Sequence, residues 1–144
     1  MYKNILLPTD GTEFCERSVK HGIALAKQLG ARVTGVTVMV PMRATISSSL
    51  PADLQDEIAN RAATNANTAL AVVANAAKAA GVPCDTVIIR DEQPYEGIID
   101  AAKKNGCDLI VMASHGRRGI SAVMLGSETQ KVITHTTIPV LVCR

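Results

Sequence analysis

Aromatic residues are almost absent from this chain of 144 residues. It has no tryptophan, and its aromatic side chains are Phe14, Tyr2 and Tyr95. Proteins that bind nucleic acids stack bases on aromatic rings and neutralise phosphates with clustered basic residues. A net charge of +2 is too small to favour a polyanionic partner. The composition therefore predicts no nucleic acid partner.

Long apolar runs and paired cysteines are also missing. No segment is apolar over the length that spans a membrane, and Pro8 interrupts the N-terminal apolar segment before it reaches the length of a signal peptide. Cys15, Cys84, Cys107 and Cys143 are widely separated and form no CxxC pair, so we interpret them as small buried side chains. We therefore expect no membrane partner and a location in the reducing cytoplasm.

Short apolar segments alternate with helical patterns along the whole chain. The pattern predicts strands at 4–8, 32–40, 84–90, 109–112 and 138–143, and helices at 13–29, from Pro51 to Gly81, from Pro94 to Asn105, and from Ser127 onward. Residues 42–49, with three successive serines, have neither period and predict a mobile loop. The alternation predicts one α/β domain over residues 1–144, with a five-stranded parallel sheet, helices on both faces and a Rossmann-like strand order of 3-2-1-4-5.

The segment from Asp108 to Thr129 has the pattern of an anion-binding site. A buried apolar strand ends in small polar residues, and Gly126 and Ser127 open the last predicted helix. The first N–H groups of a helix lack intrahelical partners and carry the positive end of its dipole, so this junction favours phosphate. Ser127 and Thr129 would add hydroxyl donors. The alternative is that Ser127 only N-caps the helix and the glycines only turn the chain.

A second polar turn follows the first predicted strand. Ligands bind parallel sheets in the crevice where the strand order reverses, at the carboxyl ends of the strands. Because the first and fourth strands flank that crevice, Thr9 and Asp10 are expected opposite residues 113–116 and the start of the Ser127 helix. Asp10 could accept hydrogen bonds from sugar hydroxyls or an amino group, or it could simply cap the following helix.

These motifs resemble the universal stress protein family over essentially the whole chain. The likeness lies in Pro8-Thr9-Asp10-Gly11, in Met112-Ala113-Ser114-His115-Gly116 and, nine residues later, in Gly126-Ser127. ATP-binding members have a glycine, two residues, a glycine, nine residues and then a glycine with serine or threonine. Ala113 stands where the first of those glycines is expected, a departure that is tolerable if its φ is negative.

The resemblance implies an adenine nucleotide alpha-hydrolase-like fold, ATP as cofactor, and Mg²⁺ held only through the phosphates. It also implies a homodimer formed through the final strand, residues 138–143, and a role in stress response or signalling with an unknown client protein. The implied nucleotide-binding residues are Pro8, Thr9, Asp10, Val38, Met39, Met112, Ala113, Gly116, Gly126, Ser127, Glu128 and Thr129. His115 and Arg117, in the same loop, are added as candidates because their side chains could bind a phosphate.

A dedicated catalytic site is not evident in the sequence. There is no GxxxxGK[ST] lysine, so Arg117 or Arg118 is the nearest cation for the phosphates, unless both lie on an exposed basic loop. His115 has no partner that would make it a base, and His135 lies two helical turns beyond Ser127. The chain is therefore expected to bind nucleotide rather than to act as an enzyme. A non-nucleotide interaction module and a weak ATPase or phosphotransferase are the alternatives.

Overall fold

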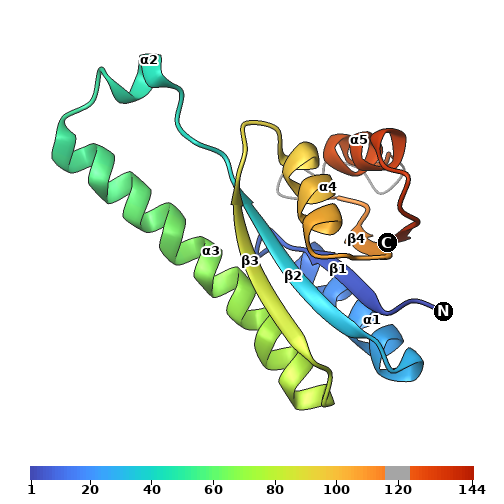
Figure 1. Cartoon of the computed structure of the whole chain (residues 1–144). Helices are drawn as coiled ribbons and strands as arrows, with labels where there is room; N and C mark the ends of the chain where they lie inside the picture. The colour runs from blue at the N-terminus through green and yellow to red at the C-terminus, as the bar shows by residue number, and fades with distance from the viewer. Residues whose placement is uncertain (116–123) are drawn as a thin grey trace.

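The computed structural model describes residues 1–115 and 124–144, and five parallel strands form its central sheet (Figure 1). The order β3-β2-β1-β4-β5 and the helices on both faces confirm the predicted fold class. The strands are β1 (Asn4–Pro8), β2 (Arg32–Met39), β3 (Cys84–Arg90), β4 (Leu109–Ala113) and β5 (Val140–Cys143). The helices are α1 (Glu13–Leu29), α2 (Ala44–Ser47), α3 (Ala52–Ala80), α4 (Pro94–Lys104) and α5 (Ser127–His135).

The core lies on the two faces of the sheet. Ile5 and Leu7 of β1 pack with α1 and α3, whereas Leu6 packs on the opposite face with α4 and α5. Side chains alternate across a strand, so a central strand that is covered on both faces is apolar on both, and a polar member such as Asn4 is hydrogen-bonded to Asn105 O and the Thr34 hydroxyl. This is why residues 4–8 and 109–113, which form neighbouring strands, are buried throughout.

Residues 42–49 differ from the prediction of a structureless loop. They contain the short helix α2, and Gln55 Nε2 of α3 donates to the backbone oxygens of Ser47 and, at 2.8 Å, of Leu50. The serine run gave no helical period in the sequence, but the Ser47 and Ser49 hydroxyl groups donate to backbone oxygens within this turn. The predicted loop is therefore wrong for residues 44–47.

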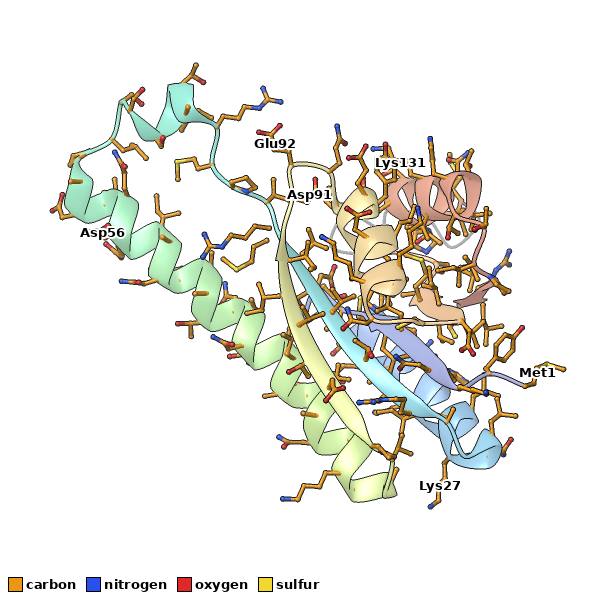
Figure 2. All side chains as sticks on the ribbon, viewed as in Figure 1. Met1, Lys27, Asp56, Asp91, Glu92 and Lys131 are labelled. Atoms are coloured by element: carbon orange, nitrogen blue, oxygen red, sulfur yellow. The ribbon has the colours of Figure 1, made fainter. Side chains whose placement is uncertain are left out.

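Helix α3 extends beyond the sheet. Its buried residues are Ala66, Ala69, Leu70, Val73 and Ala77, all in its second half. The first half projects past the carboxyl ends of the strands together with α2 (Figure 1), and Figure 2 shows Asp56 on this projecting half. Across the described parts of the chain, no helix has the length and apolar character required to cross a membrane.

Candidate functional site

The junction between β4 and α5 is held by short backbone contacts. Gly126 N–H donates to Ser114 O at 2.7 Å, and the buried Thr129 hydroxyl donates to Ala113 O at 2.8 Å. A Cβ atom on residue 126 would lie only 2.8 Å from Ser114 O, so this position requires glycine for the chain's own packing. Gly126 is also the N-cap of α5, and Ser127 is its exposed first residue. The N-cap interpretation of Ser127 is therefore wrong.

The backbone conformation at Ala113 is compatible with alanine in place of the glycine of the motif. Ala113 ends β4, and no described residue other than glycine has a positive φ. An alanine methyl group therefore introduces no backbone strain where the motif of ATP-binding family members has glycine.

The turn between β1 and α1 is built around Asp10. Its Oδ1 atom accepts hydrogen bonds from the Thr12 N–H at 3.0 Å and from the Thr12 hydroxyl at 2.6 Å, and Gly11 has a φ of 81°. The Thr9 oxygen atoms accept from the Gly11 N–H and from the Thr37 hydroxyl. Asp10 therefore shapes the turn before α1, whereas the N-cap of that helix is Thr12, without a side-chain cap hydrogen bond.

The buried thiol of Cys15 lies against the same carboxylate. Burial raises the pKa of the thiol to about 11 from its ordinary value of 9.0, and the hydrogen bond and negative charge of Asp10 act in the same direction. The neutral thiol donates to the carboxylate, whereas a thiolate beside it would repel it. Cys15 is therefore a protonated, unreactive side chain that supports the Asp10 turn.

The raised pKa of Cys15 makes the stability of the protein sensitive to alkaline pH. The folded state favours the protonated thiol, so its contribution is complete below pH 9 and is lost as the pH rises toward 11. We expect the free energy of unfolding to fall by roughly 2–3 kcal/mol at most over that range from this group. Urea unfolding at pH 8, 9, 10 and 11 measures it. Cys15→Ala is expected to flatten the decline, and an equal decline in that variant would refute the assignment.

The two turns lie close together at the carboxyl end of the sheet. The Phe14 ring at the start of α1 is 6.5 Å from the His115 ring just beyond β4, and β1 pairs with β4. The His115 Nδ1 atom is 3.0 Å from Ser114 Oγ, and its buried Nε2 atom has no hydrogen-bond partner among the described residues. The start of α1, next to the Asp10 turn, and the start of α5 therefore both adjoin the end of β4, through Phe14–His115 and Gly126–Ser114 respectively.

Some candidate side chains are engaged elsewhere. Glu128 accepts the Tyr95 N–H at 2.9 Å and binds Lys131 at 3.2 Å, so its carboxylate lies at the first turn of α4; Lys131 is labelled in Figure 2. Val38 packs toward Gly97, on the α4 face of the sheet. Pro8 and Met112 are buried, and Met39 is partly buried at the end of β2. Gly116, Arg117 and Arg118 lie outside the described residues.

Two polar residues of α3 were not expected near this site. Asn65 and Thr68 line a pocket of about 270 Å³ together with Asp10, Gly11, Ala69 and Val72. Their spacing places them on one face of the helix, but the sequence alone does not show where a 29-residue helix crosses the sheet. Within residues 1–115 and 124–144, no group of three His, Cys, Asp or Glu side chains is arranged to hold a metal ion.

Comparisons with known proteins agree with this fold and with the sequence motifs. The model of the universal stress protein family matches residues 1–144. Universal stress protein MJ0531 of Methanocaldococcus jannaschii is 32% identical, over all of this chain and 83% of its own length. A universal stress protein of Thermus aquaticus, encoded in the 3′ region of a QAH/OAS sulfhydrylase, is also 32% identical, over the full length of both chains.

Solved structures show the same architecture. The structure of protein MJ0577, also from M. jannaschii, has a TM-score of 0.82 and 30% identity, covering 99% of this chain and 95% of that one. A universal stress protein in complex with cAMP has a TM-score of 0.74 and 24% identity, covering 99% and 97%. The Archaeoglobus fulgidus protein in complex with dAMP has a TM-score of 0.73 and 16% identity, covering 99% and 98%.

Proposed function

Because the chain belongs to the universal stress protein family, we propose that it binds an adenine nucleotide, ATP in particular, at the carboxyl end of its sheet. We further propose that the protein is a cytoplasmic homodimer that acts in stress response or signalling. Bound nucleotide would alter the surface that a client protein recognises. No step of chemistry is assigned to the site.

The observation that supports this proposal is that the start of α1, next to the Asp10 turn, and the amino-terminal end of α5 both adjoin the end of β4. The first intrahelical bond of α5 runs from the Gln130 N–H to Gly126 O. The N–H groups of residues 127–129 therefore precede the regular helix ladder and, with the helix dipole, favour a phosphate group. In the proposed site, the Asp10 carboxylate would accept hydrogen bonds from the hydroxyl or amino groups of a nucleoside.

The remaining candidate residues differ in whether their side chains already bind the protein itself. His115 and Ser127 lie at the crevice, whereas the side chains of Glu128 and Thr129 are used by α4 and β4, so only their backbone N–H groups are available to the proposal. Mg²⁺ would be held by the phosphates. The complexes of fold relatives with cAMP and dAMP share an adenine group, but their low identity makes them a likeness of fold. The proposal therefore rests on the Asp10 turn and the start of α5 in this chain.

Titration calorimetry with Mg-ATP tests the proposal. We expect saturable binding with one site per chain, and weaker binding of Mg-GTP. Acid extraction of the purified protein, followed by mass spectrometry, would identify a nucleotide that remains bound. Absence of heat with ATP, ADP, AMP and cAMP, together with an empty extract, would refute nucleotide binding.

A non-nucleotide interaction module is the second candidate. Large apolar side chains are exposed at the carboxyl end of the sheet and on the projecting α2–α3 segment: Phe14, Ile46 and Met124 are 53%, 52% and 72% exposed. Exposed apolar surface favours protein contacts. A chain that contains no nucleotide and binds none would support this candidate.

A further inference from the structure

The pocket between the β1–α1 turn and α3 has a composition of its own. Asp10, Asn65 and Thr68 provide polar groups, and Ala69 and Val72 provide apolar surface. The four α3 residues follow a spacing of three, one and three, so they form one continuous strip along the helix. Gly11 closes the other side, where a Cβ atom would come within 3.4 Å of the Ala69 Cβ atom.

The size of the pocket limits what it can hold. Its volume is about 270 Å³. Pockets that enclose a whole small-molecule ligand are typically about 300–1,000 Å³. The pocket therefore suits one part of a nucleotide rather than the whole molecule.

The polar groups of the pocket favour a ligand with several hydrogen-bond donors. The Asp10 carboxylate is an acceptor, and the Thr68 hydroxyl donates its proton to Thr64 O at 2.9 Å, which leaves oxygen lone pairs as its remaining capacity. The Asn65 carboxamide both donates and accepts. A nucleoside matches this set, because its sugar hydroxyls and adenine amino group donate, while its ring nitrogens accept and its base has an apolar face.

We propose that Asn65 and Thr68 bind the adenosine end of the nucleotide opposite Asp10, while the phosphates lie toward α5. This inference rests on the proposed nucleotide binding and adds two residues that determine affinity for the nucleoside. It places the nucleoside on the α1–α3 side of the sheet, where Asp10 and α3 meet. Contact with the Val38 side chain is not part of it, because Val38 packs on the α4 side.

The test compares pocket variants with controls on the same helix. Asn65→Ala, Thr68→Val and the double variant alter the pocket, whereas Asn67→Ala and Thr64→Val change exposed residues of α3 that do not line it. Calorimetry measures the affinity of each protein for Mg-ATP, adenosine and tripolyphosphate. Circular dichroism confirms that the helix content is retained, as expected for exposed positions.

We expect Asn65→Ala to weaken ATP and adenosine binding by about tenfold, and the double variant by more. Tripolyphosphate binding should be unchanged in every variant, and both control variants should behave as the unaltered protein. ATP binding that survives the double variant would overturn the pocket proposal alone. An equal loss of tripolyphosphate binding would also overturn it. If the unaltered protein binds none of the three probes, nucleotide binding itself is refuted and the pocket proposal with it.

Discussion

Gly126→Val is expected to abolish nucleotide binding, with ATP affinity falling by at least about 100-fold, while the protein remains folded. The valine Cβ atom would lie 2.8 Å from Ser114 O and 3.3 Å from the His115 Cα atom. Both neighbours are backbone, so α5 must move away from the end of β4 rather than a side chain turn aside. The Gly126–Ser114 hydrogen bond is then lost, and the N–H groups proposed to bind phosphate are displaced.

Calorimetry with Mg-ATP measures this loss, and urea unfolding measures its cost in stability, which we expect to be about 1–3 kcal/mol for overpacking. Ser127→Ala is the control, since Ser127 is exposed and the change removes only a hydroxyl group. That variant should keep ATP affinity within about tenfold of the unaltered protein, the scale of one hydrogen bond. ATP binding by a folded Gly126→Val protein at unaltered affinity would show that the phosphates do not lie at α5.

The fold was predictable because its signals are local. A strand that is buried on both faces is mostly apolar, as residues 5–8 of β1 and all of β4 are. The glycines that follow α1 and α3, Gly30 and Gly81, adopt the left-handed conformation that ends a helix. Once the elements alternate along the chain, right-handed crossovers leave few possible strand orders. The order 3-2-1-4-5 is one of those orders; it was predicted and is confirmed.

The site was harder to predict because its contacts are not local. The Glu128 carboxylate accepts the Tyr95 N–H, from a residue 33 positions earlier, and Thr129 donates to Ala113 O. Nothing in the motif Gly126-Ser127-Glu128-Thr129 shows that two of its side chains bind the protein itself. A polar residue next to a motif can therefore belong to the scaffold, and only packing decides its role.

The last strand, β5, has an open edge that is suited to pairing with a second copy of the chain. Among the described residues, β5 pairs only with β4 and ends the sheet. The Ile110 N–H donates to Pro139 O and the Ser114 N–H to Cys143 O, so the backbone groups of residues 139, 141 and 143 face β4. In a strand the intervening residues point the opposite way, and the N–H and C=O groups of Val140 and Val142 therefore face the open edge. An unpaired edge of this kind favours pairing with a second copy of the strand.

Val142→Pro is expected to convert the proposed homodimer into a monomer. Proline removes the outward N–H group and places its ring at the edge, whereas the hydrogen bonds to β4 come from residues 139, 141 and 143 and are kept. Each copy in a symmetric pair loses this donor, so the dissociation constant should rise by at least about tenfold from hydrogen bonding alone. Sedimentation velocity at micromolar concentration measures the change.

Val142→Thr provides the matched comparison, because threonine keeps both the branched shape and the N–H group. It should sediment as the unaltered protein does, and both variants should unfold cooperatively in urea. A Val142→Pro protein that still sediments as a dimer would place the interface on another surface, and an unaltered protein that is monomeric at micromolar concentration would refute the homodimer.

If the dimer forms through this edge, its interface lies next to the proposed nucleotide site. β5 forms the interface, and its Cys143 O accepts the N–H of Ser114, the residue that follows Ala113 of that site. Nucleotide binding and dimerisation would then act on the same end of β4, and ATP should shift the dimer affinity of the unaltered protein but not that of Gly126→Val.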